Sequence, residues 1–180
     1  MNLFDIINTP QQLSNYMKEN IEYAWMDNLG NKRTKLCPEM YYEYRLMSFQ
    51  EVLKNGYGIC LDQVEFERKW FASKGIKFYT FQILLKRKTE HPGHVYLLFE
   101  ENSKCYWFEN AWNNHKGIYK FKTKSDAIMQ IKKLFITENN VKENEIKNLY
   151  NFEYEGYPCG INYEEIEKID NINFNKQKKS

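Results

Sequence analysis

Apolar residues at helical spacing follow a strong helix-start signal near the beginning of the chain. Residues 9–12, Thr-Pro-Gln-Gln, combine an N-cap threonine, a proline at the first helical position and the glutamine of a capping box. Four apolar residues then recur at helical spacing: Leu13, Tyr16, Met17 and Ile21. This stripe predicts an amphipathic helix that packs against a core. Residues 23–26 precede a polar turn, and they fit either the end of this helix or a strand that enters the turn.

A glycine-containing turn separates two further predicted helices. Residues 48–51, Ser-Phe-Gln-Glu, form a second capping box, and the helix that they start is expected to end at the Asn55-Gly56 pair. Gly58 then allows the backbone to turn sharply again. Another helix is expected over about residues 60–74, where the termini rather than a clean apolar stripe identify it. Cys60 therefore falls in the first turn of this helix.

A change to strand-like composition follows the second of these helices. Residues 76–85 are rich in β-branched and aromatic side chains, and residues 94–99 and 105–110 have the same character. A charged loop and a polar turn separate the three segments. We expect them to form an antiparallel meander, to which residues 117–121 add a fourth strand.

The C-terminal part carries weaker signals. Ser125 is expected to cap a helix with Ile128, Ile131 and Leu134 on one side. Beyond residue 139 the chain is polar and is expected to be irregular. The sequence therefore predicts one α+β domain over residues 1–165 and a polar, flexible tail over residues 166–180.

Composition narrows the class of protein. The chain has 180 residues, 42% of them hydrophobic, and a net charge of +2, which gives no electrostatic reason to expect nucleic-acid binding. Neither a secretory signal nor a long apolar run is present, and we expect a cytoplasmic protein with no membrane contact. The four cysteines lack zinc-site spacing and are expected to be free thiols. The sequence gives no indication of the oligomeric state.

Cys60 is the strongest candidate for chemistry. A helix N-terminus favours a thiolate, which is the nucleophilic form of cysteine. The Cys60 N–H is a candidate donor of an oxyanion hole. A nearby histidine can pair with that thiolate and later protonate a leaving group. His94 is preferred for this role because it starts a strand, whereas His91 and His115 fall in loops.

The hairpin between the second and third strands selects a partner for His94. If residues 101–104 form the connection and Glu100 pairs with Cys105, then His94 and Glu109 lie on the same face as diagonal neighbours. Asn110 then points to the other face. Because a slip of one residue would exchange the two, Glu109 is favoured as the group that orients His94 and Asn110 remains the alternative.

These motifs together resemble the transglutaminase-like branch of the papain-like superfamily, in particular its small bacterial members. They are Gly-x-Cys at residues 58–60, Gly-His-x-aromatic at residues 93–96 and an aromatic-flanked acid fifteen residues after His94. The resemblance implies a papain-like α+β fold with the cysteine-bearing helix packed on an antiparallel sheet. It also implies Cys60 as nucleophile, His94 as general base and acid, and an acid at Glu109.

Three features of the site depart from that family or stay open. The acid is usually an aspartate, often followed by proline, whereas Glu109-Asn110 stands here. Tyr96 occupies a position where the family often has tryptophan. The second oxyanion donor is unassigned, with Gln50 as a candidate upstream of Cys60.

The implied activity is cleavage or transfer at amide and peptide bonds through a thioester, without a cofactor. The substrate would be a peptide, a protein or a small amide, and hydrolysis is favoured over cross-linking. A catalytically inactive peptide- or protein-binding module is the alternative, and its cleft would use aromatic residues: Tyr41, Tyr42, Tyr44, Trp107 and Trp112. A metal site on Cys60 and His94 with a third ligand is a further, less favoured reading.

Overall fold

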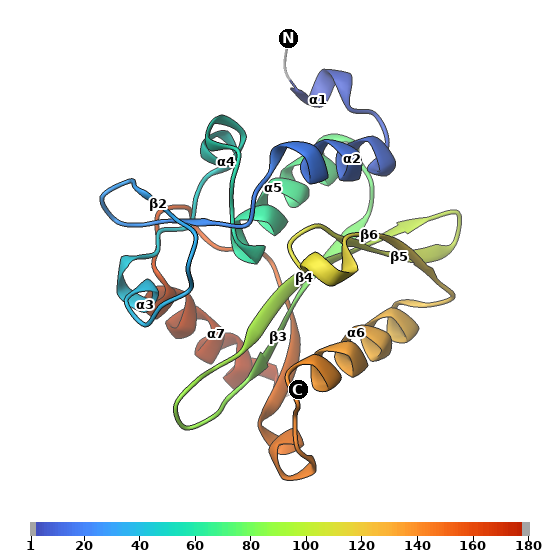
Figure 1. Ribbon diagram of the computed structural model, residues 1–180. Helices are drawn as coiled ribbons and strands as arrows, with labels where there is room; N and C mark the ends of the chain where they lie inside the picture. Colours follow the sequence, from blue (N-terminus) through green and yellow to red (C-terminus); the bar gives the residue numbers. More distant parts are fainter. Residues whose placement is uncertain (1–2, 178–180) are drawn as a thin grey trace.

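A five-stranded antiparallel sheet forms the centre of the molecule (Figure 1). The computed structural model describes residues 3–177, with side chains as far as residue 171. The strands stand in the order β6-β5-β4-β3-β7. Their bounds are β3 (Phe78–Leu85), β4 (Gly93–Glu101), β5 (Lys104–Glu109), β6 (Gly117–Phe121) and β7 (Leu149–Tyr154). The predicted α+β class, the meander of three strands and the fourth strand are confirmed.

Helices and short strands surround this sheet. The helices are α1 (Leu3–Ile6), α2 (Pro10–Asn20), α3 (Met40–Glu43), α4 (Phe49–Asn55), α5 (Cys60–Ser73), α6 (Lys124–Glu138) and α7 (Tyr163–Gln177). The 3-10 helices are η1 (Asn113–His115) and η2 (Glu143–Asn148), and a small second sheet pairs β1 (Trp25–Met26) with β2 (Lys32–Arg33). Capping boxes at Thr9 and Ser48 start α2 and α4 as predicted. Of the two readings of residues 23–26, the strand is correct.

Each face of the sheet has its own apolar core. Side chains on one face, such as Phe99 and Phe108, pack against Phe71 of α5, with ring centroids 5.0 and 5.5 Å from it. Side chains on the other face, including Trp107, pack with Phe135 of α6. Alternate residues of a strand point to opposite faces, so central strands covered on both sides are apolar throughout. The sheet therefore holds α5 and α6 on opposite sides (Figure 1).

Two predictions for the C-terminal part are wrong. Thr123, not Ser125, caps α6, because its side chain accepts the Asp126 N–H and Asp126 caps back. The chain beyond residue 139 is not irregular, since β7 pairs with β3 and α7 follows.

The predicted tail over residues 166–180 begins inside α7. Ile166 is 2% exposed and Asp170 is 4% exposed, so this part of the helix packs against the rest of the protein. The expected boundary after residue 165 therefore falls within a helix. Residues 178–180 of the predicted tail lie outside the described part of the chain.

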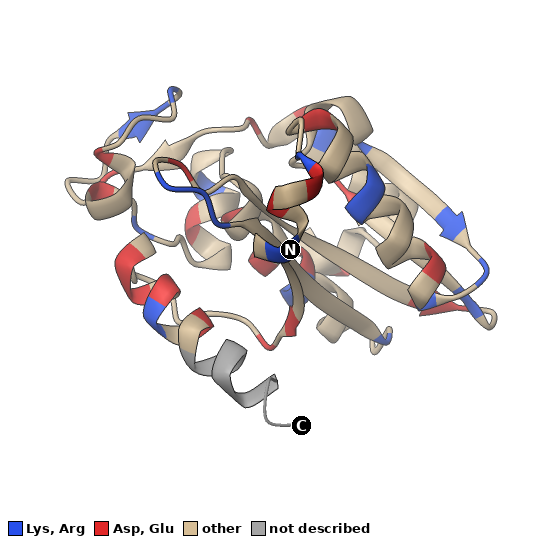
Figure 2. Ribbon diagram, turned by 90° about the horizontal axis from the view of Figure 1, so that it is seen from below, with Lys and Arg blue, Asp and Glu red and all other residues tan. Residues whose placement is uncertain are grey.

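The charged residues are spread over the helices and loops of the view in Figure 2. This distribution accords with the small net charge of +2. Within residues 3–177, no helix has the length and apolar character needed to cross a bilayer.

Candidate active site

Cys60 is the first residue of α5, as predicted, and a tight turn delivers it there. The turn depends on Gly58, because a Cβ atom at this position would lie 2.7 Å from the Cβ of Asp62. The Cys60 residue is 8% exposed, so the surrounding protein covers most of the side chain. Glycine at position 58 therefore allows the turn to lie against the helix that it starts.

Asp62 holds this turn from within the helix. Its carboxylate accepts hydrogen bonds from the main-chain N–H groups of Met47 and Ile59, at 2.8 and 2.9 Å, and from the Tyr44 hydroxyl at 3.0 Å. Burial raises the pKa of Asp62 to about 7, while these hydrogen bonds act in the opposite direction. Asp62 therefore ties the first turn of α5 to the chain on both sides of α4.

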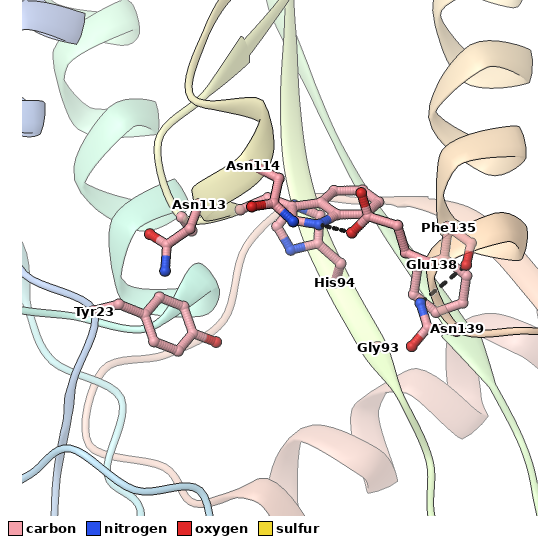
Figure 3. A pocket seen from close by; sticks show the side chains of 10 residues that line it. Tyr23, Gly93, His94, Asn113, Asn114, Phe135, Glu138 and Asn139 are labelled. Atoms are coloured by element: carbon pink, nitrogen blue, oxygen red, sulfur yellow. Dashed lines mark hydrogen bonds between the residues drawn. The ribbon is translucent and has the colours of Figure 1, made fainter.

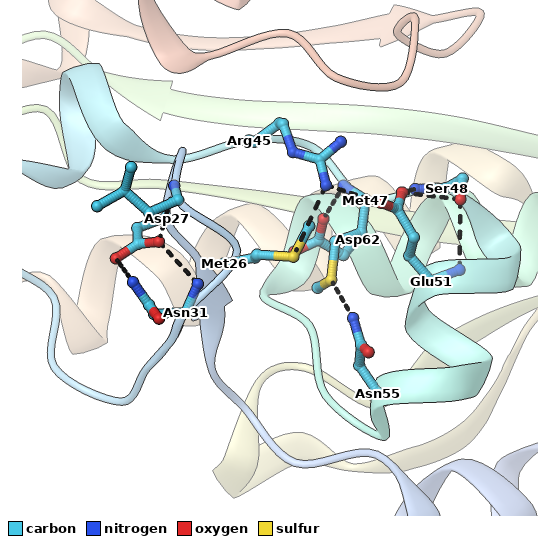
Figure 4. Close-up of polar contacts among 10 residues, drawn as sticks. Met26, Asp27, Asn31, Arg45, Met47, Ser48, Glu51, Asn55 and Asp62 are labelled. Atoms are coloured by element: carbon cyan, nitrogen blue, oxygen red, sulfur yellow. Dashed lines mark hydrogen bonds and ion pairs between the residues drawn. The ribbon is translucent and has the colours of Figure 1, made fainter.

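The segment that carries Met47 is itself held by ionic contacts (Figure 4). Glu51 accepts hydrogen bonds from the main chain and hydroxyl of Ser48, each at 2.8 Å, and pairs with Arg45 at 2.7 Å. The Met47 N–H is thereby directed at Asp62. Local capping and a short ion pair therefore help to set the position of the cysteine turn.

His94 and Glu109 lie together at the ends of neighbouring strands. The register pairs Glu100 with Cys105, as predicted, although the turn itself consists of two residues, Asn102 and Ser103, with positive φ angles of 51° and 58°. His94 Nε2 and Glu109 Oε2 are 2.8 Å apart. The predicted placement of these two side chains on one face is therefore confirmed.

The carboxylate of Glu109 is buried and fully engaged. Its Oε1 atom accepts the N–H groups of Ala111 and Trp112, both at 2.8 Å, and only 2% of the side chain is exposed. These contacts leave Oε2 for the His94 ring. Glu109 is thus held by main-chain donors in the orientation that faces the histidine.

Asn110 has a different partner, which resolves the alternative left open by the sequence. Its side-chain N–H donates to Gln63 Oε1 at 2.7 Å, and Gln63 Nε2 donates to the Gly58 carbonyl at 2.7 Å. Asn110 therefore connects the end of β5 to the cysteine turn. Glu109, not Asn110, contacts His94.

His94 also makes a hydrogen bond with the side chain of Cys60. Because Nε2 faces Glu109, the ring presents Nδ1 to the thiol. Burial disfavours the imidazolium, but the charge of Glu109 and the contacts with Cys60 and Glu109 outweigh it and raise the pKa of His94 to about 10. The raised pKa favours the protonated form of the ring, which lies between Glu109 and the side chain of Cys60.

Tyr23 is a site residue that sequence reasoning did not identify. Its hydroxyl hydrogen-bonds both the side chain and the main-chain N–H of Cys60, and burial together with Cys60 raises the pKa of Tyr23. Main-chain hydrogen bonds of the preceding residue, Glu22, with Gly56 and Gly58, at 2.9 and 3.0 Å, bring Tyr23 close to the start of α5. The phenol therefore stays protonated and can donate a hydrogen bond beside the Cys60 N–H. Gln50, the earlier candidate for such a donor, is exposed on α4.

Trp112 covers one side of the histidine. Its ring meets the His94 ring edge-on at 4.9 Å, and its indole N–H donates to Glu138 of α6 at 2.7 Å. The same carboxylate contacts His115 at 2.6 Å. Figure 3 shows His94 and Glu138 at one cavity that the labelled side chains line. His115 thus belongs to the rim, and His91 accepts a hydrogen bond from the Arg87 N–H in its loop.

A second buried carboxyl group lies close to His94 and Glu109. Glu67 of α5 is 1% exposed, and its Oε2 atom has no hydrogen-bond partner. Burial and the charge of Glu109 raise the pKa of Glu67 well above its ordinary value, while His94 acts against the rise. Glu67 is therefore held as a neutral acid, and Glu109 supplies the negative charge beside the histidine.

Two cavities meet at His94. One has a volume of about 350 Å³ and the other about 790 Å³, and Tyr23, Gly93, His94 and Asn139 line both. Cys60 lines the larger cavity. The candidate nucleophile and its histidine are therefore open to a bound molecule.

The aromatic residues expected to line a binding cleft do not all lie in one cavity. Tyr41 lines the larger cavity, whereas Tyr42 is 66% exposed and Tyr44 is buried against Asp62.

Among the described residues, no three His, Cys, Asp or Glu side chains are placed to hold a metal ion.

Neither protein-family models nor curated protein sequences give a match for this chain.

Proposed function

We propose that this protein is a thiol-dependent hydrolase or acyltransferase of the transglutaminase-like, papain-like kind, acting on amide or peptide bonds. The observation that carries the proposal is the position of His94, which contacts both Cys60 and the buried carboxylate of Glu109. A histidine oriented by an acid and in contact with a thiol is the arrangement needed for nucleophilic catalysis.

In the proposed reaction Cys60 Sγ attacks the amide carbonyl carbon, and the oxyanion that forms accepts hydrogen bonds. The Cys60 N–H and the Tyr23 hydroxyl are the proposed donors, because the hydroxyl contacts both the side chain and the main-chain N–H of Cys60. The C–N bond then breaks as the imidazolium of His94 protonates the leaving amine, which leaves a thioester on Cys60.

Water or an amine next attacks the thioester, and His94 takes up the proton that the attacking group releases. The acid or the new amide departs, and the thiolate–imidazolium pair is restored. Glu109 stabilises the imidazolium and holds the ring tautomer throughout. We favour water as the acyl acceptor because many bacterial members of the family that the sequence resembles are more similar to hydrolases than to cross-linking enzymes.

The proposal can be tested by alkylation of the folded protein with limiting iodoacetamide between pH 5 and pH 9, mapped by mass spectrometry. We expect Cys60 to react selectively at low pH, and His94→Ala to lose this selectivity. His91→Ala and His115→Ala are matched controls and should retain it. Cys105 is an internal reference because burial raises the pKa of its thiol to about 11.

Turnover of an amide or activated ester should then disappear in Cys60→Ala and persist in Cys37→Ala. Unselective labelling, or turnover that survives Cys60→Ala, would refute the proposal and favour the binding module.

The cytoplasmic location expected from the sequence also remains a prediction.

A further inference from the structure

The two cavities that meet at His94 differ in their relation to the thiol. Cys60 lines the larger cavity, while His94 lines both. In an acyl-transfer reaction the acyl carbon must lie at the nucleophile, and the leaving nitrogen must lie at the general acid. The larger cavity is therefore positioned for the acyl part of the substrate, and the smaller one for the amine part.

The larger cavity, of about 790 Å³, has extensive apolar walls. The apolar residues that line it include Met40, Leu61, Leu84, Val95, Tyr163 and Ile166. The smaller cavity, of about 350 Å³, is lined by several polar residues, among them Asn113, Asn114 and Glu138 (Figure 3).

The acidic residues of the larger cavity already have partners within the chain. Glu167 accepts the Tyr41 hydroxyl at 2.5 Å, and Asp170 accepts the Tyr157 hydroxyl at 2.6 Å. Glu90 pairs with Arg87 at 2.9 Å. These carboxylates therefore do not require a charged group on the substrate.

We infer that the enzyme selects its substrate on the acyl side, and that the preferred acyl group is bulky and apolar, a long alkyl or aromatic chain, joined to a small polar amine. This inference rests on the proposed function, because it assigns a direction to the same reaction. It adds the class of acyl group, which the pairing of Cys60 with His94 alone does not define.

Acylation of Cys60 by 4-nitrophenyl acetate and 4-nitrophenyl hexanoate tests the inference with a constant leaving group. Nitrophenolate release gives the rate, mass spectrometry locates the acyl group, and N-acetylcysteine amide gives the intrinsic reactivity of each ester. Each buried methylene is worth about fourfold. Relative to the free thiol, we expect the hexanoate to be preferred by about tenfold or more.

Two matched substitutions locate the preference. Leu84 is half-buried in the wall of the larger cavity, and Leu84→Trp should reduce the preference for the hexanoate over the acetate. Asn114→Trp, in the smaller cavity, should leave the preference unchanged. If Leu84→Trp does not fold, Leu84→Ala tests the same wall, since added space should favour esters longer than the hexanoate.

The outcomes separate the two proposals. Fast acylation of Cys60 with no chain-length preference would overturn the inference and retain the proposed function. A preference that Asn114→Trp removes and Leu84→Trp does not would also overturn it, by reversing the assignment of the cavities. Acylation of Cys60 no faster than that of the free thiol would overturn the proposed function and the inference with it.

Discussion

Replacement of Glu109 separates its role in chemistry from its role in the fold. The wild-type carboxylate accepts two main-chain N–H groups through Oε1 and contacts His94 through Oε2. In Glu109→Gln the amide oxygen can still accept both N–H groups, but the side chain carries no charge and turns an NH₂ group toward the ring. In Glu109→Ala all of these contacts are lost.

The expected loss of activity in Glu109→Gln follows from the His94 tautomer. The charge of Glu109 helps to raise the pKa of His94 to about 10, so the uncharged amide lowers it. An NH₂ donor at Nε2 also selects the tautomer with its proton on Nδ1, which then cannot accept the proton of the Cys60 thiol. Loss of the correct tautomer in a comparable triad costs about 10⁴-fold in turnover, and we expect a loss of about 10²–10⁴-fold here.

The two variants should differ in stability. Glu109→Ala leaves the buried N–H groups of Ala111 and Trp112 without an acceptor, at about 1–3 kcal/mol each, or about 2–6 kcal/mol together. Glu109→Gln retains these acceptors and should lose less than about 2 kcal/mol. Because the free energy of unfolding of a native domain is about 5–15 kcal/mol, only the alanine variant is expected to threaten the fold.

Iodoacetamide labelling of Cys60 at pH 6 measures the chemical effect, and urea unfolding measures the structural one. Glu138→Gln is a suitable control, because Glu138 contacts Trp112 and His115 on the rim. The reasoning would be refuted by a folded Glu109→Gln variant whose Cys60 reacts at pH 6 as fast as the wild-type thiol.

Three other predictions concern Gly58, Tyr23 and His94. Gly58→Ala should lower the free energy of unfolding by about 1–3 kcal/mol, because its Cβ would overlap Asp62; an unchanged urea midpoint would contradict this. Tyr23→Phe should reduce turnover by about 10²–10³-fold while Cys60 remains open to alkylation; equal turnover would exclude Tyr23 as an oxyanion donor. The pKa of His94 is about 10 in the folded protein and 6.5 ordinarily, so its contribution to stability is complete below pH 6.5 and is lost as the pH rises through 10. Urea midpoints at pH 6 and pH 10 should therefore converge in His94→Gln.

Signals confined to a few consecutive residues predicted structure well. The capping boxes at Thr9 and Ser48 and the turn at Gly58 depend on contacts across about four residues, and each was readable from the sequence. The cap of α6 shows the limit of such readings. Ser125 stands beside a true capping pair, Thr123 and Asp126, and only the hydrogen bonds distinguish them.

Contacts between distant parts of the chain were not readable. Strand β7 pairs with β3, more than sixty residues earlier. Tyr150, Phe152 and Tyr154 alternate with Asn151 and Glu153, a strand signal that the prediction of an irregular segment overlooked, but this alternation does not identify the partner strand. Tyr23 reaches Cys60 because Glu22 hydrogen-bonds the chain around Gly58, and no motif marks that pairing. Such contacts depend on the assembled fold, whereas His94 and Glu109 could be paired because a single short hairpin sets their register.

The consecutive residues Glu109 and Asn110 show why that register matters. Glu109 points to one side of β5 and holds His94, while Asn110 points to the other and holds Gln63, which in turn holds Gly58 in the cysteine turn. One strand end therefore sets the histidine and the cysteine at the same time. A slip of one residue would exchange the two side chains, placing an amide at the ring and a carboxylate at Gln63. The tight turn at Asn102 and Ser103, which sets the register, is consequently as important to the site as the residues that form it.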